Sequence, residues 1–181
     1  MQTKRLFTGT YIDKEIFEDI YVDMLEDFNG ISTGKWVEPE NLHFTYHFIG
    51  DFDSSKIPDL INELKSTCKT YKSELVIKGI SGFPNILNPR ILHAEVIDNN
   101  NILRNILSNL ERRLIPFGYK PESRKFTPHV TLQRIKSIKK DEFNSIIQDY
   151  SDFEFGKMSK FNVNLIESEL TSRGPVYRIL F

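Results

Sequence analysis

The chain has 181 residues, of which 39% are hydrophobic and 12% aromatic, so it can bury the core of one globular domain or of two small lobes that share an interface. Its formal net charge of −1 argues against a protein that coats long nucleic acid, because such binding needs a net basic surface. The single cysteine, Cys68, excludes an internal disulfide and a zinc site built on paired cysteines, and no apolar run is long enough for a signal peptide or a membrane span, so we predict a cytoplasmic protein.

The first half of the chain alternates predicted strands and helices, with a polar, proline-containing segment before the second strand. The predicted elements are a strand at 5–12, a helix at 14–28, a polar approach at 35–41, a strand at 43–50, a helix at 55–71 and a strand at 74–83.

The second half repeats this order. Its predicted elements are a strand at 90–97, a helix at 101–115, a polar approach at 118–128, a strand from 129, a helix at 139–150, a strand region at 153–170 and a closing strand at 175–181. Placing Arg5 over Arg90 gives an offset of 85 positions, and placing His43 over His129 gives 86. This agreement indicates a duplicated α+β unit with pseudo-two-fold symmetry, in which the lobes correspond to sequence halves of roughly 1–88 and 89–181. We expect antiparallel sheets to line a central cleft, with the helices outside.

A His-x-Thr triplet occurs once in each half, at His43–Thr45 and at His129–Thr131, and uses two of the four histidines. Side chains at positions i and i+2 of a strand point to the same face, so each triplet presents an imidazole beside a hydroxyl. In a symmetric pair of lobes the two triplets would meet in the common cleft.

Two imidazoles without nearby metal ligands suit paired acid and base catalysis near neutral pH, because one can begin neutral while the other begins protonated. The reaction that this arrangement serves best is in-line displacement at phosphorus, with the proton transfers on opposite sides of the phosphate. Threonine hydroxyls can donate hydrogen bonds to the non-bridging oxygens and lower the barrier by about 3 kcal/mol each.

Several strings carry a resemblance to a known family: the opening RLFTGTYI, the run from Trp36 to Thr45 that continues to Gly50, RILHAEV, FTPHVTLQR, and the closing IESELTSRGPVYRIL. With these strings the chain resembles the 2H phosphoesterase superfamily, and specifically its RNA 2′,3′-cyclic phosphodiesterases, once called 2′-5′ RNA ligases. The resemblance covers nearly the whole chain and implies a bilobal α+β fold.

The resemblance also implies an activity, the metal-independent hydrolysis of a 2′,3′-cyclic phosphate to a 2′-phosphomonoester, with weak 2′-5′ ligation as the reverse reaction. His43 matches the family's proton donor and His129 its proton acceptor, while Thr45 and Thr131 match the phosphate-binding hydroxyls. No cofactor or metal is implied. The expected partners are RNA 2′,3′-cyclic phosphate ends or small cyclic nucleotides, and the expected protein is a monomer that does not contact a membrane.

Three residues depart from the family's pattern or extend it. Strand alternation predicts that His47, where relatives commonly have lysine, lies on the face of His43 and could contact phosphate, or is a solvated residue at the strand end. His93 stands where many relatives have tryptophan and is expected to be a packed strand residue or to stack on a base. Arg134 matches a family arginine and could pair with phosphate, but only if a bulge or the strand end redirects it toward the face of the second triplet.

The polar approach to the second triplet contains Arg124 and Lys125, which could give the cleft mouth positive charge or form an ordinary exposed pair. Tyr119 and Phe7 could stack a base, although aromatic residues at such positions usually belong to the core.

Two alternatives to an enzyme of this kind stay open. The same cleft could form a non-catalytic module that binds a nucleotide or an RNA end. The second alternative is a zinc site built from His43, His47, His93 and His129, but no His-Glu-x-x-His or cysteine spacing supports it.

Overall fold

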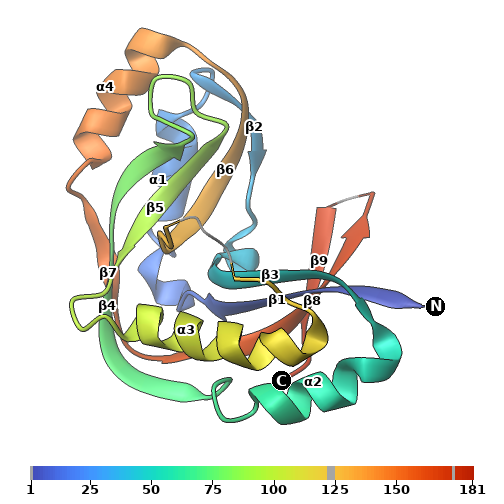
Figure 1. The fold of residues 1–181 in the computed structure, drawn as a ribbon. Coiled ribbons are helices and arrows are strands. Elements are labelled where there is room, and N and C mark those ends of the chain that lie inside the picture. Colours follow the sequence, from blue (N-terminus) through green and yellow to red (C-terminus); the bar gives the residue numbers. More distant parts are fainter. Residues whose placement is uncertain (1, 122–124, 173) are drawn as a thin grey trace.

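The protein is an α+β fold with two antiparallel sheets, seen in a computed structural model that describes residues 2–121, 125–172 and 174–181 (Figure 1). The first sheet has the order β3-β1-β8-β9, and the second has the order β2-β6-β5-β4-β7. The strands of the first sheet are β1 (Thr3–Tyr11), β3 (His43–Asp53), β8 (Asn164–Thr171) and β9 (Gly174–Ile179). The strands of the second sheet are β2 (Ser32–Trp36), β4 (Thr70–Phe83), β5 (Ile91–Ile97), β6 (His129–Ile138) and β7 (Glu154–Asn162).

The two sheets do not coincide with the two halves of the sequence. β4, from the first half, pairs with β5 in the second sheet, and β8, from the second half, pairs with β1 in the first sheet. The two exchanges are equivalent, because each half places a late strand beside the first strand of the other half. Each sheet therefore contains strands from both of the predicted halves, 1–88 and 89–181.

The helices cover the outer faces of the sheets, as predicted. α3 (Ile102–Leu114) buries a stripe of apolar side chains at helical spacing, and it lies with α2 (Ile57–Leu64) below the first sheet in the view of Figure 1. α4 (Lys140–Tyr150) packs against β4, and Phe143 of α4 contacts Phe28 at the end of α1 (Ile20–Asp27) with 5.7 Å between ring centroids. The face of each sheet that these helices do not cover is available for contact with the other sheet.

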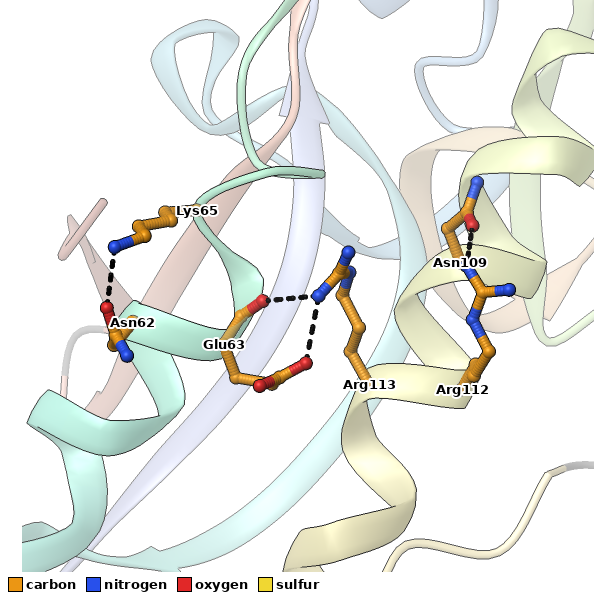
Figure 2. A network of polar contacts seen from close by, with 6 residues as sticks. All are labelled: Asn62, Glu63, Lys65, Asn109, Arg112 and Arg113. Atoms are coloured by element: carbon orange, nitrogen blue, oxygen red, sulfur yellow. Dashed lines mark hydrogen bonds and ion pairs between the residues drawn. The ribbon is translucent and has the colours of Figure 1, made fainter.

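A polar contact joins α2 to α3. The guanidinium of Arg113 donates hydrogen bonds to the backbone carbonyl and to the carboxylate of Glu63, at 3.2 and 2.9 Å (Figure 2). Both side chains are partly exposed, so the pair fixes the orientation of the helices more than it adds to stability.

Three predicted elements differ from those observed. The helix predicted at 14–28 is split into a 3-10 turn at Lys14–Ile16 and α1, and the helix predicted at 55–71 ends at Leu64. The strand region predicted at 153–170 breaks at residue 163, which lets the chain leave the second sheet as β7 and enter the first as β8. β2 is a strand that the sequence does not predict, since residues 32–34 have no predicted element and residues 35–36 belong to the polar approach at 35–41. This short edge strand buries almost none of its side chains.

Within the described ranges, no helix is both long and apolar enough to cross a membrane.

Candidate active site

The two His-x-Thr triplets begin two strands that contact each other where the sheets meet. His43 and Thr45 lie in β3 of the first sheet, and His129 and Thr131 lie in β6 of the second (Figure 1). Phe44 and Val130, the middle residues of the triplets, are fully buried, whereas the four histidine and threonine side chains are half-buried. The alternation predicted for each triplet is confirmed, and we call these four residues the two-histidine site.

Both imidazoles are held in the same way. Nδ1 of His43 lies 2.6 Å from the backbone carbonyl oxygen of Asn41, and Nδ1 of His129 lies 2.8 Å from that of Thr127. A carbonyl oxygen only accepts, so each Nδ1 is the protonated donor and the tautomer is assigned from this bond. Each Nε2 is thereby the nitrogen that can take up or release a proton in chemistry.

Burial lowers the pKa of both imidazoles, and neighbouring positive charge also lowers that of His43. For His43, burial lowers the pKa most, its hydrogen bond to Asn41 raises it, and the positive charges of His129 and Arg134 lower it further. Burial also lowers the pKa of His129, against a smaller rise from its hydrogen bond to Thr127. The lowering of the His43 pKa by the charge of His129 is what two imidazoles in one site would produce. With pKa values below the usual 6.5, both imidazoles are neutral at pH 7 before an anion binds.

Each triplet is followed by a β-bulge at the same position. In the first sheet Gly9 pairs with Thr45 but Thr8 pairs with His47, so Tyr46 is an extra residue. In the second sheet His93 pairs with Thr131 but Leu92 pairs with Gln133, so Leu132 is an extra residue. A bulge reverses the alternation beyond it, so the residues at +5 from each histidine, Phe48 and Arg134, rejoin the face of the triplets.

Arg134 is brought into the site by this bulge. Its side chain is exposed. Its positive charge adds to the lowering of the His43 pKa by burial, and it opposes the rise that burial causes in the pKa of Tyr177; both residues lie in the other sheet. The register shift in β6 confirms the bulge that the sequence predicts is needed to turn Arg134 toward the face of the second triplet. Arg134 therefore lies on the same face of β6 as His129 and Thr131.

The backbone at Arg134 depends on a glycine in β2. Gly34 has φ +151°, and a Cβ there would collide with the backbone carbonyl of Arg134. We expect Gly34→Ala to lower the free energy of unfolding by about 2 kcal/mol or more and to reduce activity by displacing Arg134. Gly30→Ala is the matched control, because Gly30 also has a positive φ of +70° but has nothing within 4 Å of its Cβ position. Chemical denaturation and steady-state kinetics measure both effects, and equal losses in the two variants would contradict the role of the close contact.

The predicted position of His47 is wrong. The bulge at Tyr46 turns His47 to the face of Thr8, away from His43, and its side chain is only 4% exposed. There Nδ1 of His47 lies 3.0 Å from the hydroxyl of Tyr119, whose ring packs edge-on against the imidazole. His47 is thus part of the packing between β3 and the segment after α3, and the suggested contact of His47 with phosphate is not supported.

His93 is a packed strand residue that also contacts His129. It is 3% exposed, stacks on Phe83 with 4.1 Å between ring centroids, and lies edge-on to His129 at 5.1 Å. Burial and the charge of His129 lower the pKa of His93 to about 4, so it stays neutral beside His129. Among the described residues no three His, Cys, Asp or Glu side chains gather closely enough to hold a metal ion, and the zinc arrangement of four histidines is not formed.

Aromatic side chains surround His43, and sequence reasoning found only one of them. The rings of Phe7, Tyr177 and Tyr11 lie 5.1, 5.1 and 5.9 Å from the His43 ring between centroids. Phe48 lies 6.0 Å from Phe7 and is 64% exposed. Nothing in the sequence points to Tyr177, because no spacing relates β9 to the triplets. Simple strand alternation places Phe48 on the face opposite His43, and only the bulge at Tyr46 brings it to the same face.

The other predicted base-stacking and charged residues are less involved. Phe7 is 2% exposed and packs under His43, while Tyr119 contacts His47 away from the site. Lys125 is exposed, and Arg124 lies outside the described residues.

Comparison with known proteins places this geometry among phosphoesterases. A family model described as LigT-like phosphoesterase matches residues 19–93 and 97–177. The RNA 2′,3′-cyclic phosphodiesterase of Aquifex aeolicus is 33% identical over 99% of this chain and 96% of its own length. The protein of the same name from Methanocaldococcus jannaschii is 34% identical over 97% of this chain and 98% of its own.

Solved structures share the fold at lower identity. A protein of Thermus thermophilus superposes with a TM-score of 0.77 at 22% identity, covering 98% of this chain and 95% of its own. LigT of E. coli, crystallised with 3′-AMP, superposes with a TM-score of 0.77 at 20% identity, covering 99% of this chain and 97% of its own.

Proposed function

Because this chain belongs to the LigT-like phosphoesterase family, we propose that it hydrolyses 2′,3′-cyclic phosphates at RNA ends or on small nucleotides to 2′-phosphomonoesters. The observation that carries the proposal is the equivalent hydrogen bonding of His43 and His129, which leaves each Nε2 for proton transfer. The names of the full-length relatives support the substrate, and the binding of 3′-AMP by E. coli LigT supports a nucleotide.

In the proposed mechanism the cyclic phosphate lies between the two imidazoles. Nε2 of His129 takes a proton from water, whose oxygen attacks phosphorus opposite O3′. The P–O3′ bond breaks, and protonated Nε2 of His43 gives its proton to O3′, which leaves a 2′-phosphomonoester and a 3′-hydroxyl. Thr45 and Thr131 donate hydrogen bonds to the non-bridging oxygens, and Arg134 offsets their charge.

The same step with a different nucleophile would give weak ligation. When a 5′-hydroxyl replaces water as the nucleophile, loss of O3′ leaves a 2′-5′ phosphodiester by the same two proton transfers. Water is present at far higher concentration, so hydrolysis dominates.

Product analysis tests the proposal. Incubation with an oligonucleotide that ends in a 2′,3′-cyclic phosphate should give a 2′-phosphate, identified by ³¹P NMR or by resistance to a 3′-specific phosphatase. A dominant 3′-phosphate would reverse the assignment of the leaving oxygen. Saturable nucleotide binding without turnover at any pH would instead identify a non-catalytic binding module.

We expect activity to survive metal removal. Each Nδ1 is committed to a backbone carbonyl, and the two Nε2 atoms act as proton carriers in the proposed mechanism. Dialysis against EDTA should leave kcat within about twofold of its starting value, since no step uses a Lewis acid. Loss of activity with EDTA and recovery with zinc would contradict the metal-free mechanism.

The lowered pKa values of His43 and His129 predict an acidic optimum for kcat/KM. The reactive free enzyme has His43 protonated and His129 neutral, so the rate falls as pH rises through the pKa of His43 and as pH falls through that of His129. Both pKa values lie below 6.5, so kcat/KM should peak below that pH. The bound phosphate anion raises both pKa values, so kcat should peak at a higher pH than kcat/KM.

Initial rates across a pH series at saturating and at low substrate concentration separate the two profiles. A kcat/KM maximum in alkaline solution would show that the histidines do not have the assigned protonation states.

A further inference from the structure

A second concave site lies beside the two-histidine site. A cavity of about 320 Å³ is enclosed by the end of β1, by β7 and by the start of β8, with Ile179 of β9 at its edge. Its volume is at the small end of the range of roughly 300–1,000 Å³ that is usual for small-molecule sites. None of the residues that line it belongs to the two-histidine site.

Strand register places this cavity on the same face of the first sheet as the two-histidine site. Tyr11 pairs with His43, and Gly9 pairs both with Thr45 on one side and with Asn164 on the other. Directly paired residues of neighbouring strands share a face, so Tyr11 and Asn164, which line the cavity, point to the side of His43 and Thr45. A ligand can therefore extend from one site to the other along a single sheet face.

Tyr11 connects the two sites. Its ring lies 5.9 Å from the His43 ring between centroids, and the same side chain lines the cavity. A group attached to a phosphate at His43 thus meets Tyr11 first when it continues toward the cavity. An aromatic ring at this junction suits a base or a ribose, because either can pack on its face.

The residues that line the cavity suit a neutral polar group that is attached through a single phosphate. Asn162 and Asn164 bring amide groups, which both donate and accept, and Asn162 is oriented by a hydrogen bond of 2.7 Å from Thr70. Amides of this kind match the edges of nucleobases. Lys160 supplies a cation and Asp13 an anion, so the cavity does not favour a cluster of phosphates.

We propose that this cavity binds the nucleoside on the 5′ side of the terminal, cyclic-phosphate-bearing nucleotide, with Lys160 contacting the phosphodiester that links the two. The inference rests on the proposed function and narrows its substrate class from RNA ends or small nucleotides to oligonucleotide ends. A mononucleotide fills only the two-histidine site, whereas a dinucleotide reaches both sites.

The test compares a nucleoside 2′,3′-cyclic phosphate with a dinucleotide that ends in the same group. We expect kcat/KM to be at least about fivefold higher for the dinucleotide, since one stacked base usually contributes that much or more. Lys160→Ala should lower the ratio of the two kcat/KM values at least about threefold, and Lys160→Glu should lower it further. Lys140→Glu, at an exposed lysine of α4 that does not line the cavity, is the matched control and should keep the wild-type ratio.

A ratio near one in the wild-type protein, or a ratio that Lys160→Glu does not change, would overturn the proposal. The outcome is distinct from failure of the hydrolase itself, in which neither substrate is turned over. In that case calorimetric binding of the dinucleotide 2′-phosphate against the mononucleotide 2′-phosphate decides the question, and equal affinities would overturn the subsite.

Discussion

Replacing His43 or His129 by asparagine should lower kcat for a 2′,3′-cyclic nucleotide by about 10²–10⁴-fold, the usual contribution of a general acid or base. Asparagine is preferred to alanine because its amide NH₂ can still donate to the carbonyl that now accepts from Nδ1, so the strand start keeps its hydrogen bond. The double variant should be little worse than the poorer single variant, because the two groups act in one concerted step.

The pH profiles of the two variants distinguish the roles. Loss of His43 should remove the fall in rate at rising pH, and loss of His129 should remove the fall at decreasing pH. Exchange of these two effects would swap the acid and base assignments, and near-wild-type rates in either variant would remove that histidine from the mechanism. Thermal unfolding of each variant shows whether a lost rate reflects a lost fold.

Replacing Thr45 or Thr131 by valine should lower kcat and kcat/KM together by about 10²-fold each, because a hydroxyl aimed at a developing negative charge lowers the barrier by about 3 kcal/mol. Valine has nearly the shape of threonine and also favours a strand, so the change removes the hydroxyl with little effect on packing. Serine at either position should recover much of the activity.

Thr33→Val is the matched control for the threonine variants. Thr33 is an exposed strand residue whose hydroxyl contacts that of Ser137 outside the site, and its loss should leave the rate unchanged. A rise in KM with unchanged kcat for Thr45→Val or Thr131→Val would mean that the hydroxyls bind ground state and transition state equally.

The placement of the two triplets can be predicted from the sequence because the signal is local. Within a triplet the distance from histidine to threonine is fixed by the strand, and the same triplet in both halves indicates the pairing of equivalent strands. The positions beyond each triplet are less predictable, since one extra residue reverses the face of everything after it. The face predicted for His47 is wrong for this reason. For Arg134 the match to a family arginine implies a bulge, and β6 contains one.

Long-range strand order is the part of the fold that local sequence patterns do not predict. β4 and β8 each pair with a strand of the other half, and the composition of neither strand predicts its neighbour. Tyr177 follows from the same exchange, because β9 reaches the His43 side only after β8 has joined β1. Short polar strands such as β2 are missed because they bury too little to produce a periodic pattern.

The reciprocal placement of β4 and β8 also bears on how this architecture arises and folds. An isolated first half would leave β2 and β4 without the strands they pair with, and an isolated second half would leave β7 and the β8–β9 pair without theirs. The two halves complete each other's sheets, which is the relation between the chains of a domain-swapped dimer. Polypeptides cut between residues 88 and 89 should therefore be poorly folded alone and regain structure when mixed, and the two histidines would then come from separate chains.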